Sequence, residues 1–306
     1  MGRVSTPDAA GSAQARPCAL VTNDDGVEGL GLAPLAAAAV AAGYDVVVAA
    51  PSRDRSGAGA AVDAELDGDR LPVVEVALPW PDATGPGLDA DDPKAWAAEA
   101  RQHEGTDRLR VLAVAASPAF CVRAGLRGAF GRVPDLVLSG VNHGLNTGAA
   151  VLHSGTVGAA LTATVFGVRG LAVSAGTVPG RGLDVAPATW GAVVRVVAGT
   201  LRWVEEHEPV GTLSVNVPHV GLGDELRGLR AATLASAGTA QGVAFERGEG
   251  WVRLQAPTPE ADGPEDEGSD TVLLAQGWAT ATLLGPVEQR AGDELDLGDL
   301  AGPAAG

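Results

Sequence analysis

Residues 18–50 contain a strand–helix–strand pattern, and this pattern restricts the chain to few folds. Residues 18–22 (CALVT) form a short apolar run, residues 30–43 (LGLAPLAAAAVAAG) are Ala-rich and end in glycine, and residues 44–50 (YDVVVAA) are rich in valine. Short apolar runs are typical of buried parallel strands, whereas alanine favours helix and glycine commonly follows its last turn. Strands that a helix connects in this way run parallel. We therefore predict a βαβ unit.

The alternation continues to residue 217 and predicts a doubly wound α/β architecture. We expect strands at 110–115, 135–139, 170–174 and 213–217, and helices at 118–126, 156–166 and 187–207. Residues 80–108 interrupt the pattern with one short helix candidate around Trp96, and the acidic residues 257–270 predict a solvated loop. After residue 225 the helices stop, and segments such as 251–256 and 271–284 predict strands or hairpins. One domain over residues 18–290 accounts for these elements, between a disordered lead-in at 1–17 and a flexible tail at 291–306.

Charge and composition narrow the partners and the compartment. The chain has 21 basic and 38 acidic residues, and this net charge of −17 repels nucleic-acid polymers and anionic membranes. Cys18 and Cys121 lie in apolar surroundings outside any CxxC pair, as expected for reduced thiols. No apolar run reaches the roughly 20 residues of a membrane helix, and residues 1–17 lack the apolar core of a secretory signal. We therefore expect a cytoplasmic protein with no nucleic-acid and no membrane partner.

Three polar segments follow predicted strands: residues 23–26 (NDDG), 51–57 (PSRDRSG) and 139–160 (SGVNHGLNTGAAVLHSGTVGAA). Ligands bind beyond the carboxyl ends of the strands in open α/β sheets, so these segments are expected along one rim. The adjacent Asp24 and Asp25 have three interpretations. One of them caps the next helix, or they share a proton as an acid/base dyad, or both bind a divalent cation as hard oxygen ligands. The cation explains both carboxylates, and Ser56 and Asn142 offer further oxygen ligands on the same rim.

The third polar segment predicts an anion site. Ser154, Gly155 and Thr156 precede a predicted helix, whose first N–H groups attract anions. The segment lacks the GxxxxGK[ST] pattern, and no clean GxGxxG or GxSxG motif occurs, so dinucleotide binding and acyl transfer have no support. His143 and His153 are candidates for a general acid or are surface residues. A cation beside an anion site suggests metal-assisted attack on a phosphoryl group.

Several motifs together resemble the SurE family of survival-protein 5′/3′-nucleotidases. They are LVTNDDGVEGLGLAPLA, APSRDRSGAG, SPAFCVRAGL, DLVLSGVNHGLNTG, LHSGTVGAAL, LSVNVP and SDTVLLAQGWATATLL, in the family's order over most of residues 19–285. The resemblance implies a three-layer α/β/α Rossmann-like fold with a mostly parallel sheet. It also implies C-terminal hairpins or arms, from about residue 225, that form homodimers or homotetramers.

The resemblance further implies a metal-dependent phosphatase that hydrolyses nucleoside monophosphates with one divalent cation, usually Mg²⁺ or Mn²⁺. The family's metal ligands match Asp24, Asp25, Ser56 and Asn142, and its phosphate contacts match Asn146, Ser154, Gly155 and Thr156. A metal-activated water would attack phosphorus in line, with Asp24 or Asp25 as catalytic residues and Asp24 favoured to orient or deprotonate the water.

The sequence departs from the family pattern at residues 58–62 (AGAAV), Phe120, residues 161–163 (LTA) and residues 282–284 (TLL). None of these positions is an implied ligand or phosphate contact. The changed residues after Ser56 and at Phe120 nevertheless leave the leaving group of the substrate undetermined, and two alternatives stay open. In one, the same chemistry acts on a non-nucleotide phosphomonoester or a short polyphosphate. In the other, the protein binds nucleotide or metal without catalysis.

Overall fold

The computed structural model describes residues 15–80, 93–207, 211–236, 244–255 and 266–285. The predicted tail at 291–306, most of the predicted lead-in at 1–17 and most of the acidic segment at 257–270 lie outside these ranges.

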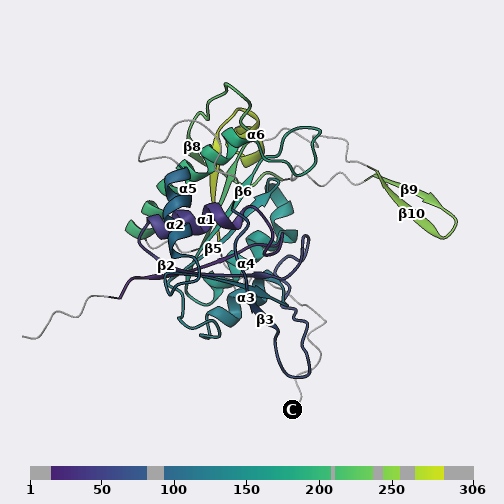
Figure 1. The fold of residues 1–306 in the computed structure, drawn as a ribbon. Coiled ribbons are helices and arrows are strands. Elements are labelled where there is room, and N and C mark those ends of the chain that lie inside the picture. The colour runs from purple at the N-terminus through teal and green to yellow at the C-terminus, as the bar shows by residue number, and fades with distance from the viewer. Residues whose placement is uncertain (1–14, 81–92, 208–210, 237–243, 256–265, 286–306) are drawn as a thin grey trace, which may run out of the picture.

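Nine strands form one sheet in the order β3-β4-β2-β1-β5-β6-β7-β11-β8. In Figure 1 the sheet extends from β3 near the bottom of the view to β8 near the top. Their bounds are β1 Cys18–Thr22, β2 Asp45–Pro51, β3 Val73–Glu75, β4 Leu109–Val114, β5 Leu136–His143, β6 Arg169–Ala175, β7 Thr212–Val217, β8 Leu229–Ala231 and β11 Ala279–Leu284. The strands from β4 through β7 in this order run parallel, β3 and β11 pair antiparallel with β4 and β7, and β8 runs parallel to β11. The prediction of a mostly parallel sheet is confirmed.

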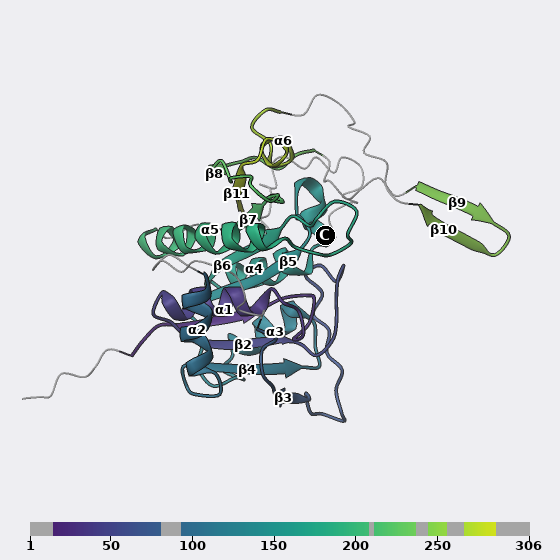
Figure 2. The ribbon, with the colours of Figure 1, turned by 45° about the horizontal axis from the view of Figure 1, so that its top comes forward.

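Helices cover both faces of the sheet (Figure 2). They are α1 Leu32–Ala41, α2 Pro93–His103 and α5 Pro187–Glu206 on one face, and α3 Pro118–Gly125 and α4 Gly155–Val165 on the other. Successive side chains of a strand point to opposite faces of the sheet, so each strand contacts the helices on both faces. In β1, Ala19 and Val21 pack on the α1 side, and Leu20 packs on the α3 side. All five residues of β1 are buried, as expected for a parallel strand that helices cover twice. The predicted α/β/α layering is confirmed.

The segment after residue 225 differs in part from the prediction. Residues 271–284 were expected as strands or hairpins, but α6 (Asp270–Ala275) precedes β11, and Gly277 with φ +84° turns the chain between them. The apolar residues of α6 do not distinguish a short buried helix from a strand by their pattern alone. β9 (Ala244–Gly248) and β10 (Trp251–Gln255) form a separate antiparallel hairpin, so the strand expected at 251–256 is confirmed.

The segment expected as one long loop at 139–160 also contains regular structure. β5 continues to His143 past an irregularity in its pairing at Gly140 and Asn142, and a 3₁₀ helix, η1 (Gly148–His153), leads to α4. Within the described ranges, no helix is both long and apolar enough to cross a membrane.

Candidate metal and phosphate site

The three polar segments meet at the carboxyl ends of β1, β2 and β5. The backbone N–H of Arg55 donates to the carbonyl of Asp24 at 2.7 Å, which joins the segments after β1 and β2. The N–H of Val141 in β5 donates to the carbonyl of Gly31 at 3.1 Å. A Cβ on Gly31 would lie 2.0 Å from the carbonyl oxygen of Val141, so only glycine permits this approach. The side chains at these strand ends therefore share one rim, as the strand order predicted.

Asp24 follows β1 and packs against the first turn of α4, and it is 4% exposed. The Thr156 hydroxyl donates to Asp24 Oδ1 at 2.5 Å. A Cβ on Gly155 would lie 2.7 Å from Asp24 Oδ2, so the carboxylate rests directly against this glycine. Burial raises the pKa of Asp24, while the hydrogen bond from the Thr156 side chain acts in the opposite direction. The first turn of α4 therefore holds the Asp24 carboxyl group in place.

Asp25 has a buried oxygen whose chemistry fits a cation ligand. Among the described residues, no donor forms a hydrogen bond to its Oδ2 atom. Burial, followed by the negative charges of Asp24 and Asp54, raises the pKa of Asp25 to about 7. A buried carboxylate oxygen without a donor is unfavourable unless a positive charge neutralises it. Asp25 and its neighbour Asp24 therefore have the chemistry of a divalent-cation site.

Ser56 and Asn142 complete the predicted donor set in different ways. Ser56 is exposed, and its N–H and hydroxyl both donate to Asp54 Oδ1 at 2.7 Å. Asn142 donates from Nδ2 to the carbonyl of Gly144 at 2.8 Å, which leaves Oδ1 as its ligand atom. Over the described ranges, no three His, Cys, Asp or Glu side chains gather around a common metal position. Any cation here would therefore need the neutral oxygens of Ser56 and Asn142 as well as the two carboxylates.

The predicted phosphate contacts occupy two places on the rim. Ser154 caps α4, because its side chain accepts the N–H of Val157 at 3.1 Å. With Gly155 and Thr156, it lies beside Asp24. Asn146 follows β5, and its Nδ2 atom donates to the hydroxyl of Ser174 in β6 at 2.9 Å. The structure thus brings Asp24, Gly155 and Thr156 into direct contact, whereas the side-chain contacts described for Asn142 and Asn146 run to Gly144 and Ser174.

The two histidines of the third segment have separate environments. His143 packs edge-on against Trp190 of α5, with ring centroids 5.6 Å apart, and burial lowers its pKa. A lowered histidine pKa favours the neutral imidazole, which is a poor general acid. His153 ends η1 with an exposed side chain.

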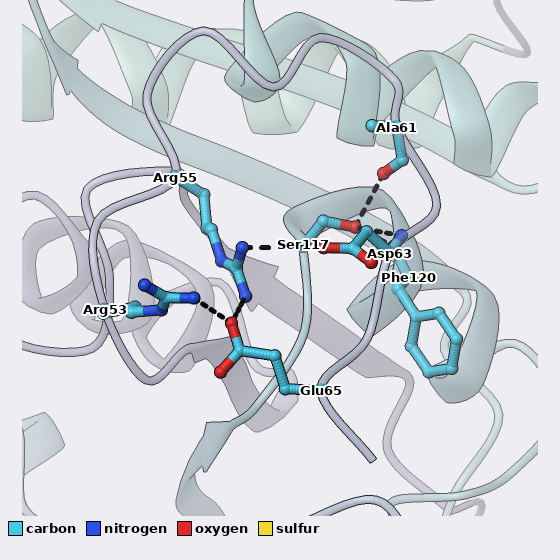
Figure 3. A network of polar contacts seen from close by, with 7 residues as sticks. All are labelled: Arg53, Arg55, Ala61, Asp63, Glu65, Ser117 and Phe120. Carbon is cyan, nitrogen blue, oxygen red and sulfur yellow. Dashed lines mark hydrogen bonds and ion pairs between the residues drawn. The ribbon is translucent and has the colours of Figure 1, made fainter.

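A network of polar contacts holds the segment that follows Ser56 (Figure 3). Arg53 and Arg55 both form ion pairs with Glu65, and the Arg53 hydrogen bond is the main cause that lowers the pKa of Glu65. Ser117 caps α3 and also donates to the carbonyl of Ala61 at 2.6 Å. These contacts fix where the chain returns from Ser56 to the sheet.

Sequence reasoning missed Glu65, Ser117 and Asp54 as residues that shape the site. The signal for Asp54 was present, because an aspartate two residues before a serine often accepts that residue's backbone N–H. The contact of Ser117 with Ala61 spans 56 residues and has no local signature.

The chain was compared with families and structures of known proteins. The model of the family described as survival protein SurE matches residues 19–241. The chain is 34% identical over 213 residues to a 5′-nucleotidase SurE of Synechococcus elongatus, which covers 69% of this chain and 68% of that protein. It is 31% identical over 271 residues to a 5′-nucleotidase SurE of another Synechococcus species, with coverage of 87% and 91%.

The fold is similar to the crystal structure of the Sure protein from Aquifex aeolicus. The TM-score is 0.60 at 24% sequence identity, and the match covers 88% of this chain and 93% of that chain.

Proposed function

The chain belongs to the SurE family, and on this premise we propose that it is a nucleotidase that hydrolyses nucleoside monophosphates to nucleoside and phosphate. The observation that carries the proposal is the pair of adjacent carboxylates at the end of β1: Asp24 is buried and rests against the N-terminus of α4, and the Oδ2 atom of Asp25 is buried without a donor in the described structure. A cation site and an anion site side by side are what phosphoryl transfer requires. The named 5′-nucleotidases among the relatives support the substrate class.

We propose that Asp24, Asp25, Ser56 and Asn142 hold one divalent cation, Mg²⁺ or Mn²⁺. The Asp25 oxygen without a hydrogen-bond donor in the described structure supports this donor set. When bound, the cation would neutralise charge on the phosphoryl group and lower the pKa of a coordinated water. Asp24 is the better placed carboxylate to orient the attacking water, because Thr156 fixes its Oδ1 atom.

The start of α4 would bind the phosphate. The N–H of Val157 already donates to the Ser154 side chain, so the N–H groups of Gly155 and Thr156 are the donors of this turn that would face a ligand. Ser154 accepts a hydrogen bond in its capping contact and keeps its own hydroxyl hydrogen to donate. Asn146 would contact the phosphate from the β5 side, with its orientation set by Ser174.

Hydrolysis of nucleoside monophosphates with and without EDTA tests the proposal. We expect chelation to abolish phosphate release, and added Mg²⁺ or Mn²⁺ to restore it. Asp24→Asn and Asp25→Asn should lose activity, whereas Asp107→Asn, at an exposed carboxylate outside the site, should retain it. Full activity after chelation, or in Asp24→Asn, would contradict the mechanism.

A phosphomonoester other than a nucleotide is the second candidate substrate. The apolar residues 58–62 follow Ser56, and Val62 is 45% exposed there, which favours a different leaving group. Phosphate release from nucleotides, sugar phosphates and short polyphosphates separates the candidates, because a preference for nucleotides eliminates the second one. Tight nucleotide binding without turnover under either metal would instead establish a binding protein.

We also propose that the chain forms a homodimer or homotetramer through the part that begins near residue 225. A two-stranded hairpin such as β9–β10 is marginal in water by itself, and Trp251 on it is 46% exposed. Light scattering at micromolar concentration should give a mass above that of one chain. A monomer at this concentration would contradict the assembly.

A further inference from the structure

Two buried side chains from the second half of the chain hold the short segment Asn146–Gly148, between β5 and η1. The first is Asn216 of β7, which is 1% exposed. Its Oδ1 atom accepts the backbone N–H of Asn146 at 2.8 Å, and its Nδ2 atom donates to the backbone carbonyl of the same residue at 2.9 Å. One amide therefore fixes both polar groups of one peptide position across 70 residues of sequence.

The second buried side chain is Asp270, the first residue of α6. It is 1% exposed, and its Oδ2 atom accepts the backbone N–H of Gly148 at 2.8 Å. Its Oδ1 atom accepts the N–H groups of Ala235 at 3.0 Å and Thr271 at 2.9 Å. Three backbone donors thus surround a buried carboxylate. The contact with Gly148 spans 122 residues of sequence.

The two contacts act on the same short segment and leave it little freedom. Asn146 and Gly148 are separated only by Thr147, which is fully buried. The Asn146 side chain is held as well, by the hydroxyl of Ser174. Gly148 has φ +52° and begins η1, which leads to Ser154 and the start of α4. A shift at Asn146 or Gly148 would therefore move the residues proposed to contact phosphate.

We propose that Asn216 and Asp270 are positioning residues that hold Asn146 and Gly148 for phosphate binding. The inference rests on the proposed function for the identity of the anion. It makes β7 and α6 part of the phosphate site, although neither contributes a proposed metal ligand. Loss of either contact should therefore weaken phosphate binding and leave cation binding at Asp24 and Asp25 unchanged.

The test compares Asp270→Asn and Asn216→Asp with the wild-type chain. Asp270→Asn keeps the shape of the side chain but turns one acceptor into a donor, and Asn216→Asp keeps the acceptor for the Asn146 N–H while removing the donor to its carbonyl. Glu267→Gln, at an exposed acidic residue of the same segment, is the matched control. Calorimetry would measure binding of Mn²⁺ alone and then of inorganic phosphate in the presence of Mn²⁺.

We expect both variants to bind phosphate about ten-fold more weakly and to raise KM by a similar factor, because small displacements of a binding group have effects of this size or larger. Mn²⁺ affinity should stay within about two-fold of wild type, since the proposed cation ligands are untouched. Amide hydrogen exchange at Gly148 should accelerate in Asp270→Asn, and exchange at Asn146 should accelerate less. A purely structural role would lower the unfolding temperature without this separation of phosphate from Mn²⁺ binding.

Unchanged phosphate affinity in folded Asp270→Asn and Asn216→Asp overturns the inference, whatever their stability. If Asp270→Asn does not fold, Asn216→Asp and Ser174→Ala decide the question by the same measurements. If the wild-type chain binds phosphate but hydrolyses no nucleotide, the proposed function fails and the positioning role is still decided by calorimetry. If the wild-type chain binds no phosphate, both fail.

Discussion

Replacing Gly155 with alanine should displace the Asp24 carboxylate. An added Cβ would lie 2.7 Å from Oδ2, 2.8 Å from Cβ and 3.1 Å from Cγ of Asp24. Ordinary contacts of this kind begin at 3.4 Å, so Asp24 or the start of α4 has to move by about 0.7 Å. Because Thr156 holds Asp24 and the side chain is buried, rotation into solvent does not relieve the contact.

The magnitude follows from two opposing effects. Overpacking a buried contact costs about 1–3 kcal/mol of unfolding free energy, and replacing glycine in a helix returns at most about 1 kcal/mol. The difference lies between roughly 0 and 3 kcal/mol, and its central value of about 1–2 kcal/mol corresponds to a decrease in Tm of roughly 2–8 °C for a domain of this size. Since a misplacement of about 1 Å in a catalytic geometry reduces the rate about 100-fold, we expect kcat/KM to fall about 10- to 100-fold.

Gly199→Ala is the matched control. Gly199 lies inside α5, and an added Cβ there meets no atom within 4 Å. This variant should gain roughly 0.5–1 kcal/mol of stability at unchanged activity. The assays are thermal and urea unfolding without metal, and phosphate release with Mn²⁺. Wild-type activity in Gly155→Ala, with Gly199→Ala behaving as expected, would show that Asp24 does not rest on Gly155 in the working enzyme.

Three further predictions concern pH, the core and the α3 cap. Burial raises the pKa of Asp25 to about 7, so the folded metal-free protein binds more protons than the unfolded chain between about pH 4 and pH 7, and its stability falls as pH rises through this range. Urea unfolding at several pH values checks this, and an unchanged slope in Asp25→Asn would refute it. Leu20→Ala should lower the unfolding free energy by about 2–5 kcal/mol, because Leu20 is 1% exposed. Fully exposed Leu222 should tolerate alanine, and equal losses at both positions would contradict the packing. Ser117→Ala should cost about 1–2 kcal/mol in thermal unfolding, since it removes a helix cap and the contact with Ala61, whereas Ser117→Thr should retain both; equal Tm values for the two variants would count against the cap.

Most elements between residues 18 and 217 were predictable because they have a local pattern, whereas the short strand β3 and the 3₁₀ helix η1 were not predicted. The Ala-rich helix α1 and the Val-rich strand β2 show their type within a few residues. β11 and α6 were harder, since both derive from one apolar stretch and differ in what packs against them. β11 joins the sheet next to β7, a pairing that no local pattern indicates.

The positions of Asp24 and Asp25 at a strand end were predictable from the order of strands and polar segments. Their contacts were not. The hydrogen bond from Thr156 to Asp24 joins residues 132 apart, and before the fold is known Thr156 is equally available to a ligand. The roles of Asn216 and Asp270 likewise depend on backbone groups that only the folded chain brings to them.

The order of strands in the sheet has a consequence for synthesis on the ribosome. β8 emerges before β11, yet β11 lies between β7 and β8 and is the neighbour through which β8 joins the sheet. At about 5–20 residues per second, the nascent chain waits several seconds with the outer edge of β7 uncovered. Unpaired strand edges attract other chains. Chaperones that shield nascent chains should therefore raise the yield of native protein most during translation of the stretch between β8 and β11.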